Sequence, residues 1–399
     1  MLDPIPPSVK KNHRFFTQGR TGVHCLLMPP VRPFVAKPLP RAGLDWKGLV
    51  PAIGRATRAL ARYDGILHGV PDPAVLLSPL TTQEAVLSSK IEGTQATLGD
   101  VLRFEAGEPP ASSERREDIR EILNYRRALR QAERALAKGQ FSLTLLKRLH
   151  AILLESVRGR DKTPGEYRRA RVWVGEPGTP IEQARFIPPE PGQVPKLLAN
   201  LEAYWCGQEL DPLVQLALIH AQFEIIHPFR DGNGRIGRML VPLFLYEKKL
   251  LSRPMFYLSQ YFDAHRTEYI ARLRALNGPG SWKTWTGFFL RALAEQADAN
   301  ADKARRILAL YERLKARTIE LTRSHYAVPL LDRLFAQPVF ASNDLFRDPK
   351  MPTKPVVTLL LQRLRDAGIL KQLRKASGRR AQVLALAELV NLCEGKKVL

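Results

Sequence analysis

Residues 227–238, HPFRDGNGRIGR, bring a histidine, a carboxylate, an amide and three arginines together in twelve positions. Gly232 and Gly234 allow backbone N–H groups to turn toward an anion, and the N-terminus of a following helix adds a partial positive charge. Arg235 and Arg238 lie three positions apart, so both guanidinium groups can bind phosphoryl oxygens beside the first turns of that helix. The segment therefore predicts a phosphate-binding loop.

Two further residues of this segment have chemistry suited to a reaction at those phosphates. Asp231 is its one carboxylate, and a carboxylate beside phosphates is most simply a Mg²⁺ ligand. His227 is a residue type that accepts a proton near neutral pH, as a general base for an attacking hydroxyl must. Taken singly, each feature is commonplace, since a histidine at a helix end is usually a cap or a packed ring. Together they predict phosphoryl or nucleotidyl transfer.

The loop is expected to lie between two buried helices. Asp211 and Pro212 are a typical N-cap and first-turn pair, and the apolar stretch LVQLALIHAQFEII predicts a buried helix as far as Ile226. RIGRMLVPLFLYEKKL then resumes an apolar helix. Over residues 46–294 apolar residues recur at three- and four-residue spacing, so the fold class is predicted to be mainly α.

The segment HPFRDGNGRIGR resembles the Fic-family signature HPFx[D/E]GNGRxxR at every fixed position, and the similarity covers roughly residues 50–294. Fic enzymes transfer AMP from ATP to a hydroxyl side chain (Ser, Thr or Tyr) of a target protein, with Mg²⁺ bound. The resemblance implies that His227 is the general base and that Asp231 holds the metal ion. It also implies a set of phosphate-binding residues: Gly232, Asn233, Gly234, Arg235 and, for the γ-phosphate, Arg238.

Two other segments are similar to parts of the same family. YLSQYF, residues 257–262, matches a segment that lines the nucleotide pocket, which implies candidate contacts from Ser259, Gln260 and Tyr261. Residues 165–189 cluster β-branched and aromatic residues around a Gly/Pro-rich tip, which predicts a β-hairpin. This hairpin resembles the family's flap, which pairs with an extended segment of the target protein. The alternative is a surface hairpin packed on the domain.

An earlier segment, TTQEAVLSSKIEGTQAT, predicts a short helix over residues 82–92. Thr81 and Glu84 have the spacing of a capping box, and Gly93 is a natural stop. We therefore expect Thr81 to cap the helix.

The end of this predicted helix resembles the Fic inhibitory motif [S/T]xxxE[G/N], here placed before the catalytic motif. Ser88 and Glu92 share one face, and Gly93 completes the match. The resemblance implies that Glu92 pairs with Arg238 and takes the place of the γ-phosphate. Two alternatives stay open. Glu92 is an ordinary exposed residue of a last helical turn, or it orients a water molecule that removes AMP from modified targets.

The C-terminal part of the chain has a different pattern. Residues 295–324 predict a charged connecting helix, and residues 325–399 predict a small second domain. Three helical segments, VPLLDRLFAQPVF, SNDLF and TKPVVTLLLQRLRDAGIL, precede two predicted strands, KQLRK and AQVLAL, which is the winged-helix order. Its basic residues favour DNA or a protein partner: Lys354, Arg363, Arg365, Lys371, Arg374, Lys375, Arg379 and Arg380. Relatives of this architecture are often dimers, so a homodimer is possible.

Composition sets wider limits on function. Lys and Arg number 62 against 39 Asp and Glu, a formal charge of +23, which favours anionic partners in general. Cys25, Cys206 and Cys393 lack zinc-ligand spacing, which argues against a disulfide framework or zinc site. We expect residues 1–45, rich in proline, to form an extended arm. The start has no signal-peptide pattern and no segment reaches about 18 apolar residues, so a cytoplasmic location without membrane contact is predicted.

Two functional classes fit these features. The first is an autoinhibited protein adenylyltransferase, and the second is a winged-helix DNA-binding regulator that only senses ATP. The intact His227 favours the enzyme, because binding phosphates requires no general base. Transfer of phosphocholine or phosphate on the same scaffold remains an alternative.

Overall fold

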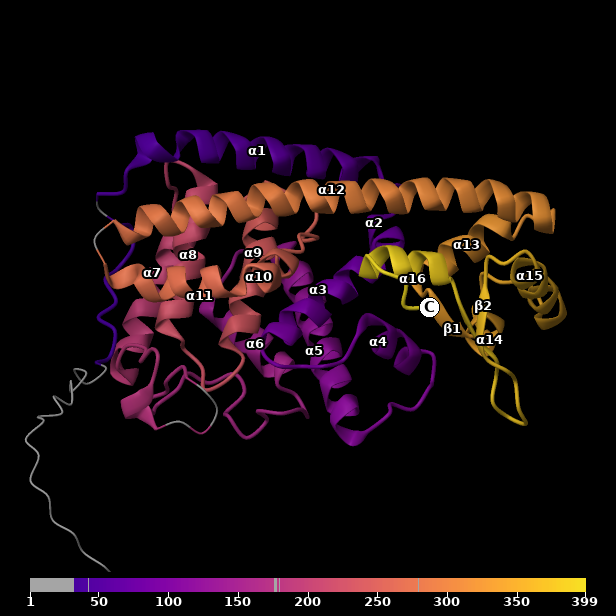
Figure 1. Cartoon of the computed structure of the whole chain (residues 1–399), viewed down its shortest axis with the longest axis horizontal. Helices are drawn as coiled ribbons and strands as arrows, with labels where there is room; N and C mark the ends of the chain where they lie inside the picture. The colour runs from indigo at the N-terminus through magenta and orange to yellow at the C-terminus, as the bar shows by residue number, and fades with distance from the viewer. Residues whose placement is uncertain (1–31, 42, 176–177, 179, 279) are drawn as a thin grey trace, which may run out of the picture.

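The computed structural model describes residues 32–41, 43–175, 178, 180–278 and 280–399. The chain is mainly α, as predicted, with a small antiparallel sheet near the C-terminus (Figure 1). The first helices in chain order are α1 (Trp46–Gly69), α2 (Pro73–Leu76), α3 (Ser78–Ile91), α4 (Leu98–Glu105), α5 (Ser113–Leu136) and α6 (Leu143–Leu153). They are followed by α7 (Val194–Cys206), α8 (Pro212–Ile226), α9 (Asn233–Glu247), α10 (Ser259–Ala264), α11 (Arg266–Arg274) and α12 (Ser281–Thr322). Within the described residues, no helix is long and apolar enough to cross a membrane.

Helices α8 and α9 form the centre of the helical core, as their all-round apolar sequences predict. Nearly every residue of α8 is buried. Asp211 caps this helix, because its side chain accepts hydrogen bonds from Leu213 N and Val214 N, both at 2.9 Å. The short loop between α8 and α9 is therefore held on both sides by packed helices.

Helix α12 is longer than the predicted connector over 295–324. It begins at Ser281, spans 42 residues and ends at Thr322. Its first turns belong to the helical core, where Trp285, Phe289 and Leu293 are fully buried. Figure 1 shows α12 lying beside α1 and continuing from the helical core to the C-terminal elements. The first part of α12 is thus a core helix, and the same unbroken helix continues through most of the predicted connector.

The C-terminal elements are α13 (Ala327–Ala336), β1 (Val339–Ala341), α14 (Ser342–Phe346), α15 (Lys354–Asp366), β2 (Lys371–Arg374), β3 (Val383–Ala385) and α16 (Ala387–Glu394). The sheet has the antiparallel order β1-β3-β2, with Leu384 opposite both Phe340 and Gln372. One prediction was wrong here, because the helix expected to include PVF ends at Ala336. Val339 and Phe340 instead pair with β3, which buries both side chains. Helix α16 was not predicted.

The C-terminal elements pack directly on the helical core. Helix α16 contacts α12, α3 and α4, and β1 contacts α4. Hydrogen bonds cross this junction from Leu98 N to Glu394 Oε1 at 3.2 Å and from Lys303 Nζ of α12 to Cys393 O at 3.2 Å. The last elements of the chain therefore lie against α3, the helix whose C-cap residue is Glu92.

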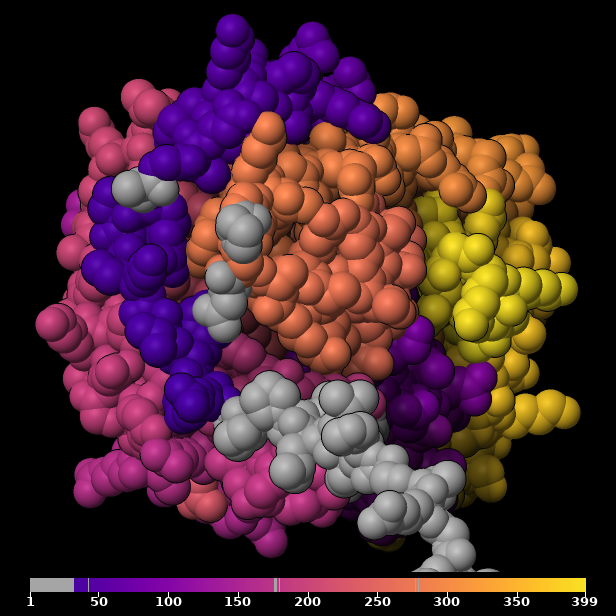
Figure 2. All heavy atoms as spheres, turned by 60° about the vertical axis from the view of Figure 1, so that its left-hand side comes forward, coloured from indigo at the N-terminus to yellow at the C-terminus, as the bar shows by residue number. Residues whose placement is uncertain are grey.

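The predicted N-terminal arm falls partly outside the described residues, namely at 1–31 and 42. Residues 32–41 have no regular secondary structure and lie along the helical core, where Figure 2 shows them in indigo. Phe34 N donates to Ile187 O at 2.8 Å, and the backbone of Leu39 exchanges two hydrogen bonds with the Asn200 side chain of α7. This part of the arm is extended and packed, as expected.

Candidate active site

The loop between α8 and α9 is shaped by two left-handed residues and one side chain. His227 ends α8 with φ 49° and ψ 59°, and Gly232 precedes α9 with φ 78°. Asn233 closes the loop, because its side chain accepts from Phe229 N and donates to Phe229 O, each at 2.9 Å. These two hydrogen bonds hold the Asn233 side chain within the loop, which it therefore organises.

His227 is held in one protonation form. Its Nδ1 lies 3.4 Å from Glu224 O, and a carbonyl only accepts, so Nδ1 carries the proton and Nε2 is left as an acceptor. Burial lowers the pKa of His227 to about 4, which keeps the ring neutral at neutral pH. A neutral imidazole with a free Nε2 can act as a general base.

Arg168, which sequence reasoning missed, fixes the turn at His227. Its buried guanidinium donates to His227 O at 2.8 Å and to Ile226 O at 3.2 Å, and its backbone N donates to Pro228 O at 2.9 Å. A cation at a helix C-terminus satisfies carbonyls that have no helical partner. Arg168 is therefore a positioning residue that connects the 165–189 segment to the loop.

His150 supports the loop from the other side. Its Nδ1 accepts from Gly165 N at 2.8 Å, so its Nε2 carries the proton and donates to Asp231 O at 3.0 Å. The ring stacks on Phe229 with the centroids 3.7 Å apart. Burial lowers the pKa of His150 to about 4, so it remains neutral. Nothing in the sequence distinguished this histidine from other apolar-face positions of α6.

Arg238 and Glu92 meet as the inhibitory motif implies. Arg238 Nη2 donates to Glu92 Oε1 at 2.7 Å and to Ser88 O at 2.8 Å, while Nε donates to Ser88 Oγ at 3.0 Å. The Arg238 side chain is 2% exposed and the Glu92 side chain 35%. Burial lowers the pKa of Arg238, but Glu92, Tyr269 and Glu224 together raise it by more, so the net direction is upward. Among the described residues, Glu92 is the carboxylate within ion-pair distance of this buried guanidinium, and it lies at the edge of solvent.

These side chains open onto a cavity of about 220 Å³. Four of the predicted site residues line it: His227, Gly234, Arg238 and Glu92. The Glu92 carboxylate lies so close to Gly234 that a side chain at position 234 would collide with it. This contact explains on steric grounds why position 234 is a glycine. The rest of the lining comes mainly from α8, α11 and the 165–189 segment: Val174, Phe186, Glu224, Ile225, Arg266, Tyr269, Ile270, Leu273 and Arg274.

Comparison with known proteins identifies the family to which this arrangement belongs. The Fic/DOC family profile matches residues 140–245, which include the whole loop, and the Fic/DOC family N-terminal profile matches residues 50–134. This chain is a Fic/DOC family protein. The conclusion agrees with the resemblance drawn from HPFRDGNGRIGR.

Curated relatives of this Fic/DOC protein are named as adenylyltransferases. A probable protein adenylyltransferase of Aquifex aeolicus is 28% identical over 202 residues, 50% of this chain and 55% of that protein. Protein adenylyltransferase Fic of Drosophila grimshawi is 30% identical over 160 residues, 39% of this chain and 31% of that protein. The chain thus spans about half the length of the first relative and about a third of the second.

Solved structures show the same fold at low sequence identity. A Fic family protein from Desulfovibrio desulfuricans has a TM-score of 0.55 and 20% identity, covering 88% of this chain and 98% of that one. A Fic domain containing signaling protein from Bacteroides thetaiotaomicron has a TM-score of 0.51 and 19% identity, covering 63% and 96%. The first of these matches extends well beyond the residues that the two family profiles match.

Some predicted site residues of this Fic/DOC protein lie outside the cavity. Ser259 N and Oγ donate to the buried Glu84 at 3.1 and 2.6 Å, Gln260 is exposed, and Tyr261 OH accepts from Arg291 Nε at 3.2 Å. Among the described residues, the cavity wall on this side comes instead from α11. The sequence indicated this wall only through the helical spacing of Tyr269, Ile270 and Leu273.

Arg235 also lies outside the described lining of the cavity. Its guanidinium is 2% exposed and donates to Glu121 Oε2 at 2.7 Å, with Glu121 itself 1% exposed. The reason is electrostatic, because a buried carboxylate needs a buried cation. Arg235 therefore joins α9 to α5, and its nearest site contact is Asp231, at 3.4 Å.

Asp231 has the features of a single-carboxylate metal ligand. Its side chain is 37% exposed, and Oδ1 accepts from Gly232 N at 2.5 Å. The described residues contain no group of three or more His, Cys, Asp or Glu side chains arranged to hold a metal. Mg²⁺ commonly takes one or two carboxylates and completes its coordination with phosphate oxygens and water. Asp231 fits that kind of site.

The 165–189 segment is less regular than the predicted hairpin. Between its described residues one antiparallel bridge forms, Val174 with Phe186, and Val174 N donates to Phe186 O at 2.8 Å. A short 3-10 turn, η1 (Ile181–Gln183), occupies the second arm, and residues 176–177 and 179 lie outside the described residues. The predicted two-stranded hairpin was therefore too regular, although both bridge residues line the cavity.

Helix α3 begins earlier than expected, at Ser78, and its N-cap residue is Leu77. The predicted capping box was wrong. Thr81 Oγ1 lies 3.1 Å from Tyr257 OH, and Glu84 accepts from Ser259. Pro79 in the first turn allows this earlier start. Gly93 follows the helix end with φ 100°, as the predicted stop requires.

Glu224 is a site residue that sequence reasoning missed. It lines the cavity beside Arg238, and its Oε1 is buried without a hydrogen-bond partner in the described structure. Burial raises the pKa of Glu224 to about 7, in opposition to Arg238, which lowers it. Glu224 could have been found from the sequence, because it lies three residues before His227, near the end of the same helix.

Proposed function

We propose that this chain is a Mg²⁺-dependent protein adenylyltransferase, which transfers AMP from ATP to a Ser, Thr or Tyr hydroxyl of a target protein and is autoinhibited by Glu92. The observation that carries the proposal is the pairing of Arg238 with Glu92 at 2.7 Å, beside a histidine whose Nε2 is an acceptor. The names of the curated relatives support the same activity.

The proposed reaction uses few groups. The target hydroxyl oxygen attacks the α-phosphorus of ATP, and His227 Nε2 accepts the hydroxyl proton. A new P–O bond forms to the target, the bond between the α-phosphorus and the bridging oxygen breaks, and pyrophosphate leaves. Backbone N–H groups at the start of α9 donate to phosphate oxygens. Mg²⁺, when held at Asp231, would neutralise part of the phosphate charge.

Autoinhibition follows from what Arg238 can bind. A carboxylate and a γ-phosphate present the same kind of acceptor to a guanidinium, and Arg238 Nη2 holds one Glu92 oxygen. While Glu92 remains there, the triphosphate cannot reach its productive position. Because the Glu92 side chain is 35% exposed, it can leave without crossing a packed core. This partial exposure supports a reversible block rather than a permanent one.

The target protein would dock at the 165–189 segment. Val174 and Phe186 reach the cavity, and Trp173 and Val174 are 43% and 37% exposed. An extended target segment that adds to this backbone edge would bring its hydroxyl over the cavity. The exposed apolar side chains would supply contact area.

The proposal is tested by transfer of label from α-phosphate-labelled ATP with Mg²⁺ to the protein itself and to a cell lysate. Glu92→Gly is expected to become labelled, and adding His227→Ala is expected to abolish the label while ATP binding is kept. His68→Ala, at an exposed position of α1, is the matched control for removing a histidine. Adding it to Glu92→Gly should leave labelling unchanged. If His227→Ala removes ATP binding together with transfer, the histidine is structural and the proposed base is wrong.

Two other activities would explain a negative result. No label in any variant, with ATP still bound, would favour removal of AMP by a water oriented at Glu92, or ATP sensing without transfer. Labelled target protein incubated with the chain separates these, because only AMP removal releases the label.

For residues 325–399 we propose a winged-helix domain that binds a partner. The order α13, β1, α14, α15, β2, β3 supports this fold. Two of its predicted contact residues are engaged within the chain, since Arg363 Nη1 donates to Thr322 O at 2.9 Å and Arg374 Nη2 to Ala381 O at 3.1 Å. The exposed face of α15 includes Val356 and Leu359, which favours a protein partner or a second copy of this chain over DNA.

A further inference from the structure

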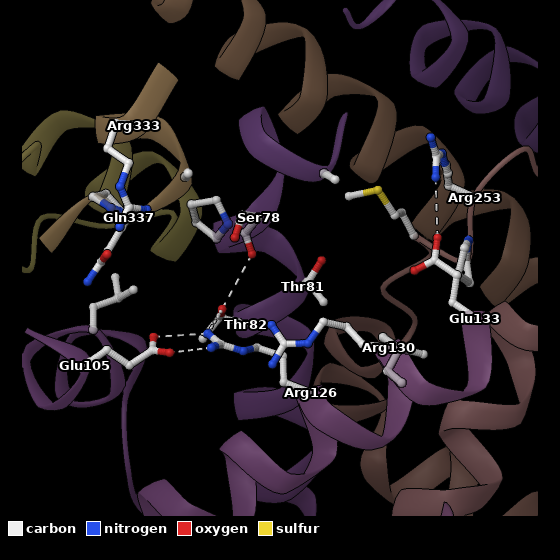
Figure 3. Close-up of a pocket in the computed structure, with 18 residues that line it drawn as sticks. Ser78, Thr81, Thr82, Glu105, Arg126, Arg130, Glu133, Arg253, Arg333 and Gln337 are labelled. Atoms are coloured by element: carbon white, nitrogen blue, oxygen red, sulfur yellow. Dashed lines mark hydrogen bonds and ion pairs between the residues drawn. The ribbon is translucent and has the colours of Figure 1, made fainter. Parts of the chain in front are cut away.

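A second cavity, of about 470 Å³, lies where the C-terminal elements meet the helical core. Its walls come from the first turns of α3, from α4, α5 and α13, and from residues 253–255 before α10. Among the residues that the structure describes, none lines both this cavity and the one at His227. Figure 3 shows its polar lining residues, which come from separate elements around the cavity. The cavity is large enough for a small organic ligand.

The charged lining of this cavity is unbalanced. Four arginines line it, Arg126 and Arg130 from α5, Arg253 from the 253–255 segment and Arg333 from α13, against two carboxylates, Glu105 and Glu133. Glu105 pairs with Arg126, and Glu133 pairs with Arg253 at 3.6 Å. The lining therefore has an excess of two positive charges.

The two remaining arginines, Arg130 and Arg333, have no carboxylate partner within the described lining. Arg130 has no carboxylate within ion-pair distance in the described chain, and Arg333 reaches Asp348, outside the lining, at 3.4 Å. Arg126 and Arg130 are four residues apart on one helix and extend into the same space, an unfavourable pair of like charges (Figure 3). Burial and the neighbouring Arg126 both lower the pKa of Arg130. A bound anion would relieve this repulsion.

The remaining lining suits a ligand with both a charged and an organic part. Ser78, Thr81 and Gln337 offer polar groups near the arginines, while Leu129 and Met255 supply apolar surface. Arg126 Nε is buried without a hydrogen-bond partner in the described structure. Guanidinium groups match the geometry of phosphate oxygens, with charge-assisted hydrogen bonds.

We propose that this cavity binds a small phosphomonoester, with the phosphate held by Arg130 next to Arg126 and the organic part against Leu129 and Met255. The ligand would lie between α5 of the helical core and α13 of the C-terminal elements. This inference does not depend on the function proposed for the His227 cavity.

The test is isothermal titration of the full chain with ribose 5-phosphate as the probe, without Mg²⁺. Wild type is expected to bind one equivalent. Arg130→Gln is expected to weaken binding by about tenfold or more, the loss typical of one charge-assisted hydrogen bond, and Arg333→Gln, which removes a more distant lining charge, by about two- to fivefold. Arg120→Gln, an exposed arginine of the same helix α5 that lies outside the cavity lining, is the matched control and should bind as wild type does. Circular dichroism melting of each variant confirms that it is folded.

Three results would overturn the proposal. The first is no saturable binding by wild type, and the second is wild-type affinity in both Arg130→Gln and Arg333→Gln. The third is loss of binding in Arg238→Gln with no loss in the other two, which would assign the heat to the His227 cavity. Inorganic phosphate is the comparison ligand, and an affinity equal to that of ribose 5-phosphate would refute the role given to Leu129 and Met255.

Discussion

Replacing Glu92 by glycine should raise the rate of AMP transfer by roughly 10- to 30-fold. The size follows from the contact that the substitution removes. Arg238 Nη2 donates to Glu92 Oε1 at 2.7 Å, and a hydrogen bond between charged groups contributes about 1.5–3 kcal/mol. Because the Glu92 side chain is 35% exposed, solvent weakens its pairing with Arg238. We therefore use about 1.5–2 kcal/mol, the lower part of that range, as the free energy of the pair.

That free energy determines the fraction of molecules in which Arg238 is not paired with Glu92. At about 1.4 kcal/mol per tenfold, 1.5–2 kcal/mol leaves roughly 3–8% of molecules with Arg238 free of Glu92. Removing the carboxylate leaves Arg238 free to bind the γ-phosphate in every molecule. The rate of AMP transfer therefore rises by the inverse of the fraction that is open in wild type. The side chain of Arg238 keeps its two bonds to Ser88, so the guanidinium should stay in place.

The assay is the initial rate of transfer from α-phosphate-labelled ATP at saturating Mg²⁺. Glu92→Gln should give an intermediate rate, because the amide oxygen still accepts from Arg238 but carries no charge. Glu117→Gln on the exposed face of α5 is the control and should match wild type. A Glu92→Gly rate within twofold of wild type, with ATP bound equally well, would refute the reasoning that this ion pair limits activity.

Two further predictions follow from the same site. Ser88→Ala removes the 3.0 Å bond to Arg238 Nε but leaves Glu92 in place, so transfer in the same rate assay should change by less than about fivefold; a rise as large as that of Glu92→Gly would show that Ser88 is the main restraint. Because burial lowers the pKa of His227 to about 4, its neutral form persists as pH falls, and kcat/KM of the Glu92→Gly variant should stay flat from about pH 8 to about pH 5.5. Removing Glu92 also removes a negative charge that raises this pKa, so the acid limb cannot move upward; a tenfold fall between about pH 7.5 and 6, in protein still folded by circular dichroism, would contradict the structural pKa.

Local sequence predicted the elements whose signals are local. The cap of α8 and the apolar sequences of α8 and α9 made two buried helices around a loop predictable, and Gly93 marked the end of α3. The pairing of Arg238 with Glu92 came from the resemblance of two motifs, because no spacing in the sequence brings residues 146 positions apart together. The start of α3 was missed because the carboxylate of Glu84 has a distant partner, Ser259, which outweighs a local cap.

Charged residues of the site were the least predictable from sequence, because their roles depend on which partner the fold supplies. Arg235 and Arg238 share one helix and are equally buried, and each binds a carboxylate at 2.7 Å. What separates them is the exposure of that carboxylate, 1% for Glu121 and 35% for Glu92.

A carboxylate buried on all sides cannot leave without stranding its arginine, which costs several kcal/mol, so the Arg235 pair is structural. The pair at Arg238 opens toward water and toward the cavity of His227, where a phosphate can replace the carboxylate without leaving the guanidinium unpaired. The exposed fraction of the partner therefore distinguishes the arginine that holds the fold from the arginine that can exchange ligands, and it identifies Glu92 as the carboxylate whose removal should change activity more than stability.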